Sequence, residues 1–316
     1  MPDVKKKKEK SEFLPVLVMG FLFLVVYGLV LFLMKPFVEQ GCVSPAFEDI
    51  NDPMNILYII VIMLGMTLVI LLIAKYWKEK LIQFIILGAV GYTSFFAFFL
   101  PIFSILFPLN LTGIILFFSV AAAVVLVVVL YKYPEWYVID ISGVIVGVGA
   151  IIIFGISLGV SLVLLLLVVL AVYDAISVYK TKHMIDLADT VMDLKLPVLL
   201  VIPKMRHYSL IRETKRLKEK LEHDEERDAF FMGLGDIVMP GILVGAVYYN
   251  IPNSLPVALS TIFGTLVGFS ILMFFVMKGK PQAGLPLLCG GAISGYIISS
   301  LIFFGKLNGL VFPFLK

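Results

Sequence analysis

Charged residues are scarce in this sequence. Asp, Glu, Lys and Arg make up 15% of its 316 residues, hydrophobic types make up 61%, and the mean hydropathy is +1.06. A soluble domain is about half apolar and about a quarter charged, so this composition excludes a soluble enzyme, a disordered chain and a nucleic-acid-binding module. The two cysteines, Cys42 and Cys289, are too few for a disulfide framework. What remains is a polytopic helical membrane protein.

Nine apolar segments are long enough to cross a bilayer as helices. Each crossing needs about 20 predominantly apolar residues. The apolar run from 137 to 178 has 42 residues. As a helix it would be roughly 63 Å long, twice the hydrocarbon thickness, so we expect it to fold back within the glycine-flanked segment 155–159. The predicted spans are 13–34, 56–74, 81–107, 113–131, 137–157, 158–178, 229–250, 255–277 and 284–304.

Basic residues are concentrated on one side of these spans. Alternate segments, including the amino-terminal tail and the loop after the sixth span, contain 22 of the 25 Lys and Arg residues. The positive-inside rule therefore predicts a cytoplasmic amino terminus and an extracytoplasmic carboxyl terminus. The expected fold is all-α with nine transmembrane helices: a basic cytoplasmic tail (1–12), helices one to six (13–178), a cytoplasmic loop (179–228) and helices seven to nine (229–316). We expect the tail to contact anionic lipid rather than nucleic acid.

Three carboxyl groups lie within the predicted spans, which contain no Lys, Arg or His. A charged side chain at the bilayer centre costs about 2.5–3.5 kcal/mol on the insertion scale, so each acid is a functional candidate. Asp140 lies at the cytoplasmic end of the fifth span, where we expect it to snorkel or pair at the interface. Asp174, near the end of the sixth span, and Asp236, near the start of the seventh, are expected at similar depths, some 6 and 10 Å below the cytoplasmic boundary.

Two carboxyl groups at one depth, with no basic partner, can share one proton and one water. One carboxylate then activates the water and the other acid protonates the carbonyl or the leaving amine. Such a pair predicts a bell-shaped dependence of rate on pH. A cation or proton relay in a transporter or channel uses paired acids too, although the sequence has no obvious inverted repeat. A scaffold without catalytic activity is a further alternative.

The residues around the two acids form motifs. Tyr173 precedes Asp174, and Asp236 ends the sequence Gly-Leu-Gly-Asp, which begins at Gly233. With these motifs on consecutive spans of a nine-span chain, the sequence resembles the presenilin and signal peptide peptidase family of intramembrane aspartyl proteases, and in particular an archaeal-type presenilin homologue. The resemblance implies that Asp174 and Asp236 hydrolyse peptide bonds within transmembrane segments.

The resemblance also implies residues that position the substrate. Beside the two acids they are Tyr173, Gly233, Leu234 and Gly235. The family's third motif, Pro-Ala-Leu followed by Pro, aligns with the start of the ninth span, where only Leu-Pro matches. The residues there are Ala283, Gly284, Leu285 and Pro286.

Backbone features around the motifs suggest how the site is built. Gly233 and Gly235 are expected to let the sixth helix approach Asp236 closely. Pro240 should soften the seventh helix, because it removes a backbone donor. We expect 233–240 and 283–286 to line a wet cavity that opens to the cytoplasm. Two further glycine pairs, at 143 and 147 and at 241 and 245, are interpreted as ordinary helix packing.

The apolar segment 196–203 is too short to span and ends in proline. It is either an apolar segment on the surface or an extended strand that pairs with an unwound substrate. The resemblance favours the strand, because the family's corresponding loop takes part in substrate engagement.

Other protease classes are excluded by the positions of their essential residues. All three histidines fall in the cytoplasmic loop, whereas Ser157 lies at the outer turn, so no histidine base can reach this serine. The sequence has no His-Glu-x-x-His motif, which excludes the common zinc intramembrane proteases. Cys42 and Cys289 should lie too far apart to bond.

The expected protein is thus a multi-pass enzyme of the cell membrane that uses neither a metal nor an organic cofactor. Its partners would be the lipid bilayer, transmembrane protein or peptide substrates and, in a homo-oligomer, further copies of itself. Nucleic acid is not expected as a partner. The predicted orientation matches the presenilin branch of the family, which implies substrates with cytoplasmic carboxyl ends.

Overall fold

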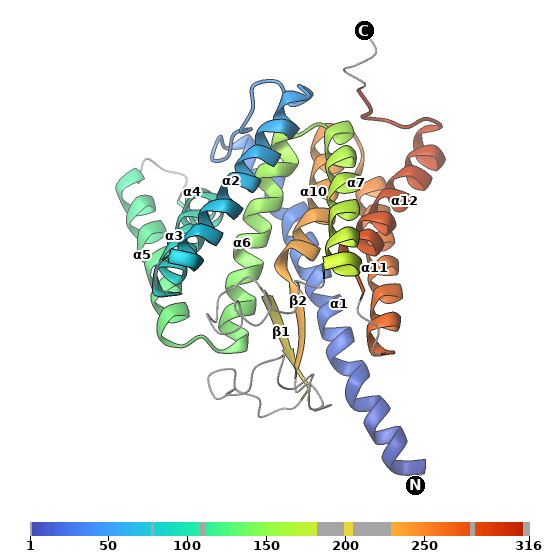
Figure 1. Cartoon of the computed structure of the whole chain (residues 1–316). Helices are drawn as coiled ribbons and strands as arrows, with labels where there is room; N and C mark the ends of the chain where they lie inside the picture. The colour runs from blue at the N-terminus through green and yellow to red at the C-terminus, as the bar shows by residue number, and fades with distance from the viewer. Residues whose placement is uncertain are drawn as a thin grey trace.

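The structure, a computed structural model, describes residues 2–76, 79–107, 111–181, 199–204, 229–278 and 282–311. Helices dominate these ranges (Figure 1). The helices are α1 (Pro2–Glu39), α2 (Met54–Tyr76), α3 (Glu79–Ser94), the π-helix η1 (Phe95–Phe99), α4 (Leu100–Leu106), α5 (Thr112–Lys132), α6 (Trp136–Ser157), α7 (Val160–Ile176), the π-helix η2 (Ser177–Thr181), α10 (Leu234–Asn250), α11 (Leu255–Met277) and α12 (Gly284–Phe304). The strands are β1 (Leu199–Pro203) and β2 (Ala229–Gly233).

Each predicted span has a helical counterpart in the structure. Within the described ranges, seven helical segments are long and apolar enough to cross a membrane. The remaining two apolar helices are shorter by this measure, namely Met54–Met66 within α2 and Leu234–Asn250. The third span is continuous from α3 through η1 to α4, and Pro101, which has no backbone N–H to donate, lies directly after the π-helical turn η1.

The fold-back between the fifth and sixth spans is confirmed. α6 ends at Ser157 and α7 begins at Val160, which leaves two residues for the turn. The Ser157 hydroxyl accepts a hydrogen bond from the Ala46 N–H (2.8 Å), and the Gly159 N–H donates to the Ile50 carbonyl (2.7 Å). The loop before α2 therefore holds this turn, and Ser157 has a structural role there.

The expectation of a purely α-helical fold is wrong in one place. β1 and β2 form an antiparallel pair in which Leu199 lies opposite Gly233 and Pro203 opposite Ala229. The seventh helix consequently begins at Leu234 rather than at residue 229. The segment Ala-Phe-Phe-Met-Gly is as apolar as the helix that follows it, so hydropathy alone does not separate the two. Its backbone nevertheless pairs with a strand about thirty residues earlier in the chain.

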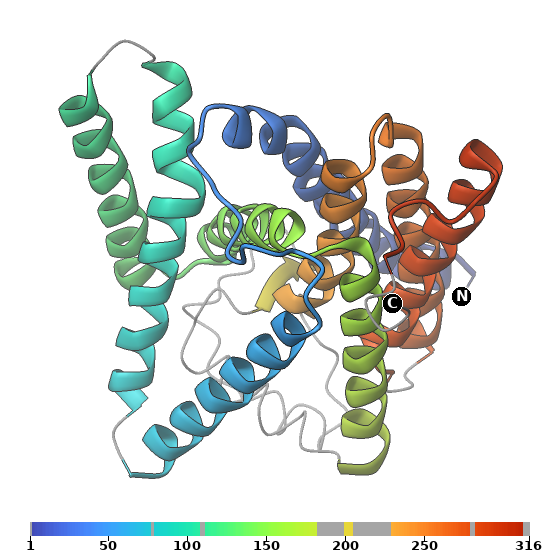
Figure 2. The ribbon, with the colours of Figure 1, turned by 90° about the horizontal axis from the view of Figure 1, so that it is seen from above.

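The helix α10 lies at the centre of the molecule, in contact with α1, α6, α7, α11 and α12. Figures 1 and 2 show α3 and α5 on one flank and α11 and α12 on the other. Most residues of α10 from Ile237 to Val247 are buried. In contrast, α2 and α5 expose many large apolar side chains. Such surfaces would be a liability in water but suit helices that face lipid.

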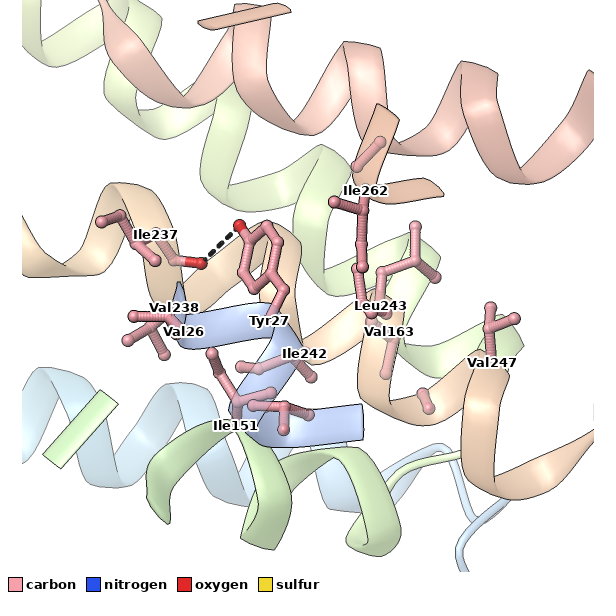
Figure 3. Close-up of a cluster of buried hydrophobic side chains, with 14 of the residues drawn as sticks. Val26, Tyr27, Ile151, Val163, Ile237, Val238, Ile242, Leu243, Val247 and Ile262 are labelled. Carbon is pink, nitrogen blue, oxygen red and sulfur yellow. Dashed lines mark hydrogen bonds between the residues drawn. The ribbon is translucent and has the colours of Figure 1, made fainter. Parts of the chain in front are cut away.

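The glycine pairs interpreted as packing sites are confirmed as such. A methyl group on Gly241 would meet Ile151 and Tyr27, and one on Gly245 would meet Met34 and the backbone of Gly155. Figure 3 shows this core, where α1, α6 and α10 meet. The helices α11 and α12 also approach through glycines, with Gly264 against the Gly291 carbonyl and Gly268 against the Leu287 carbonyl. Close backbone contact of this kind is typical of helix pairs in membranes.

Candidate active site

Asp174 lies on α7, three residues before the helix changes to the π-helical turn η2. Its carboxyl group is partly buried. The Leu285 N–H donates a hydrogen bond to Asp174 Oδ2 (3.0 Å), and the Gly284 N–H also points at this carboxyl group. Both donors belong to the first turn of α12. The first N–H groups of a helix have no partner within the helix, so they are available to bind a carboxylate.

Asp236 lies in the first turn of α10. Gly233 is the N-cap of this helix and Asp236 is the third helical residue, a spacing that lets a side chain reach back to the N-cap N–H. The Gly233 N–H is indeed within hydrogen-bonding range of the Asp236 carboxyl group. The Gly-Leu-Gly-Asp motif thus marks a strand-to-helix junction with its acid folded back over the helix start.

The two carboxyl groups meet at Gly284. A methyl group placed on Gly284 would lie 3.2 Å from Cγ, Oδ1 and Oδ2 of Asp236, while the N–H of the next residue binds Asp174. The charges of the two acids are also close enough to interact directly. Three helices therefore build the site: α7 and α10 supply the acids, and the start of α12 lies between them.

Two contacts support this arrangement from outside. The Tyr27 hydroxyl of α1 donates a hydrogen bond to the Ile237 carbonyl (2.9 Å), directly after Asp236 (Figure 3). The Tyr179 hydroxyl of η2 donates to Gln282 Oε1 (2.7 Å), just before α12. Neither tyrosine could be recognised from the sequence, because a tyrosine in or beside an apolar run gives no sign of the distant group that its hydroxyl will bind.

The predicted positioning residues fall into separate environments. Leu234 packs toward α6, with its Cδ1 3.5 Å from the place of a methyl group on Gly147. The side chain of Tyr173 is 65% exposed on the outer surface of α7 and is not brought to the acids. Ala283 is buried as the N-cap of α12.

The role expected for the motif glycines is wrong. Around Gly235 no atom lies within 4 Å of the place where a side chain would begin, and at Gly233 the neighbour is Asp236 itself. α7 therefore does not approach through these glycines; the close contact to Asp236 comes from Gly284 of α12.

The ninth predicted span begins as a regular helix. α12 begins at Gly284, and Pro286 lies in the first turn, where its missing N–H removes no helical hydrogen bond.

Of the two alternatives expected for Asp140, snorkelling or pairing, the structure shows pairing, with a backbone N–H as the partner. Asp140 is only 7% exposed, and its Oδ1 accepts a hydrogen bond from the Val201 N–H of β1 (2.8 Å).

The segment 196–203 is described from Leu199 onward, where it forms β1, while Val198 lies outside the described residues. The wet cavity around 233–240 and 283–286 stays a prediction. Within the described ranges, no three His, Cys, Asp or Glu side chains are placed to hold a metal ion.

Comparisons with known proteins identify the class to which this site belongs. Residues 19–305 match the family described as signal-peptide peptidase, presenilin aspartyl protease. Two solved structures of a presenilin family intramembrane aspartate protease are similar to this chain. One, in space group C222, has 35% identity and a TM-score of 0.63, with 92% of this chain and 99% of that chain covered. The other, in space group P2, has 37% identity and a TM-score of 0.65, with 92% and 98% covered.

A search of curated proteins found no significant match. The family match and the structural matches define a multi-pass membrane protein with a presenilin-like fold. The chain belongs to the signal-peptide peptidase and presenilin aspartyl protease family and is an intramembrane aspartyl protease, that is, an aspartic endopeptidase. These matches lend no support to the alternative of a transporter or channel.

Proposed function

We propose that Asp174 and Asp236 are the catalytic pair and that together they hydrolyse a peptide bond of a transmembrane segment. One carboxylate takes a proton from a water molecule, whose oxygen attacks the peptide carbonyl carbon. The other acid protonates the carbonyl oxygen, and a proton then passes to the amide nitrogen as the C–N bond breaks. The observation that carries this proposal is the convergence of both carboxyl groups on Gly284 and Leu285.

The backbone at the start of α12 has a specific role in this mechanism. The Leu285 N–H orients Asp174, and the missing side chain of Gly284 leaves room for Asp236. Hydrogen bonds that are in place before the reaction need no rearrangement during it. The motif residues Leu-Pro at 285 and 286 thus act through the backbone at position 285, while Gly284 replaces the bulkier alanine of the family pattern.

The extended substrate would pair with the two-stranded sheet. A helical peptide bond is shielded by its own hydrogen bonds, so the segment must unwind before water can attack it. Successive N–H groups of a strand point to opposite sides. Because the Val201 N–H binds Asp140, the N–H groups of Leu200 and Ile202 point to β2. Their partners in the ladder are Met232 and Phe230, so the backbone of Phe231 points to the other edge of β2, which leads directly to Asp236.

The membrane topology that fits this mechanism has nine spans, with the amino terminus in the cytoplasm and the carboxyl terminus outside. The distribution of basic residues supports it. So does the placement of the start of α1 at the end of the molecule that holds the strands, with the end of α12 at the opposite end (Figure 1). Substrates would then have cytoplasmic carboxyl ends, and the protein would reside in the cell membrane. It would act with lipid, with membrane-spanning substrates and, in a homo-oligomer, with further copies of itself, and without nucleic acid.

The proposal is tested with purified protein in detergent and a single-span reporter peptide. Wild-type protein should release two products, and Asp236→Ala should release none. A fluorescent or alkaline-phosphatase fusion at Lys316 tests the topology independently. Products from Asp236→Ala, or a cytoplasmic signal at Lys316, would contradict the respective part of the proposal.

A further inference from the structure

Asp140 is a buried acid outside the catalytic pair. It lies on α6 just after the first turn, and its carboxyl group binds the backbone of β1 through the Val201 N–H. A carboxyl group is costly to bury without a partner, and an apolar residue would insert more easily at this position. The hydrogen bond to β1 gives a reason for an acid rather than an apolar residue at this position.

The face of α6 that carries Asp140 is the surface on which the sheet lies. Gly143, one turn further along, faces Leu200 of β1, whose Cδ2 is 3.0 Å from the place of a methyl group. Gly147, the next residue on this face, contacts Leu234 and Val238 of α10 at 3.5 Å by the same measure. Residues spaced by three and four lie on one side of a helix. α6 therefore holds β1 and the start of α10 along a single line.

The contacts of Asp140 with the sheet also relate it to the catalytic acid Asp236. Val201 lies opposite Phe231 in the sheet, and Asp236 follows five residues after Phe231 in the chain. The hydrogen bond between Val201 and Asp140 thus fixes the position of the sheet relative to Asp236. The same hydrogen bond also occupies the outward N–H of β1, so that β1 cannot accept a further strand at this position. An unpaired strand edge otherwise invites pairing.

We propose that Asp140 is a positioning residue: by accepting the Val201 N–H it closes the outer edge of β1, directs an extended substrate to β2, and sets the substrate's register relative to Asp236. The inference rests on the proposed function, because it concerns how the substrate is placed at the two catalytic acids. Asp140 touches neither the substrate nor the reacting atoms.

The first experiment separates the hydrogen-bond acceptor from the size of the side chain. Asparagine and leucine have nearly the same shape as each other, but only asparagine retains an acceptor oxygen. Asp140→Asn should keep the cleavage rate within about threefold of wild type and leave the cut sites unchanged. Asp140→Leu should lower kcat/KM at least tenfold and add cut sites displaced by one or more residues, as seen by mass spectrometry of the products. Thermal unfolding of both variants controls for a loss of structure.

The second experiment removes the donor and keeps the acid. Val201→Pro deletes the N–H that binds Asp140 and leaves the hydrogen bonds between β1 and β2 in place. It should reproduce the displaced cut sites of Asp140→Leu, and the two changes combined should have little more effect than either alone. This variant carries the test if Asp140→Leu does not fold.

Each outcome bears on the inference separately from the proposed function. Wild-type rate and cut sites in both Asp140→Leu and Val201→Pro would overturn the inference while leaving the protease mechanism intact. So would an Asp140→Asn variant as defective as Asp140→Leu. Additive effects of the two changes would also overturn it. Failure of the wild-type protein to cleave the reporter would instead overturn the proposed function, and the inference with it.

Discussion

Replacing Leu285 with proline tests whether a single backbone N–H organises the catalytic acids. Leu285 is the second residue of α12, where the N–H has no partner within the helix and proline is tolerated. The substitution should therefore remove the hydrogen bond to Asp174 (3.0 Å) without breaking the helix. A hydrogen bond to a charged group contributes about 1.5–3 kcal/mol. At about 1.4 kcal/mol per factor of ten, kcat/KM should fall by roughly 10- to 100-fold.

The matched control for this experiment is Leu285→Ala, which removes the side chain and keeps the N–H. Its effect reports any role of the side chain in positioning substrate, and we expect a smaller loss than for the proline variant. Cleavage of the single-span reporter is measured at several substrate concentrations, with thermal unfolding to show that both variants are folded. Equal activity of Leu285→Pro and Leu285→Ala would refute the role of the N–H.

Three further predictions concern the surroundings of the pair. Gly284→Val should lower kcat/KM several-fold, because its Cβ would lie 3.2 Å from the carboxyl atoms of Asp236 and its two further methyl groups would crowd that acid. Gly284→Ala restores the alanine of the family pattern and is the control, and equal activity of the two variants would contradict the assignment. Tyr27→Phe should lower the free energy of unfolding by about 0.5–1.5 kcal/mol through the loss of its hydrogen bond to Ile237, which denaturation in detergent would measure; unchanged stability would argue against that bond. Leu200→Pro should remove a hydrogen bond between β1 and β2 and reduce cleavage, and a fully active variant would make the sheet dispensable.

Much of the site could be predicted from the sequence because charge is so rare in the spans. Asp174 and Asp236 stand out among apolar residues, and the paired motifs around them are specific. The fold-back before α7 was predictable for the same kind of reason, since an apolar run of 42 residues is too long for one crossing.

The errors have a common physical origin in long-range backbone contacts. Ala229–Gly233 has the composition of a helix end, but it pairs with β1, some thirty residues earlier in the chain. Asp140 binds a backbone N–H 61 residues away, and hydropathy carries no information on such a partner. The glycine that makes room for Asp236 is Gly284 of α12 rather than a glycine of its own motif. Each of these contacts depends on how helices are arranged, which periodicity and composition do not determine.

The central claim is that Asp174 and Asp236 act as one catalytic unit, and single and double substitutions to asparagine measure this most directly. Asparagine keeps the shape of each side chain and cannot exchange the proton that hydrolysis requires. Reporter cleavage is compared for Asp174→Asn, Asp236→Asn and the double variant at matched expression, with thermal unfolding as the control. We expect each single variant to be inactive while folded, and the double variant to be no worse than either. Substantial cleavage by either single variant would contradict the two-carboxylate mechanism.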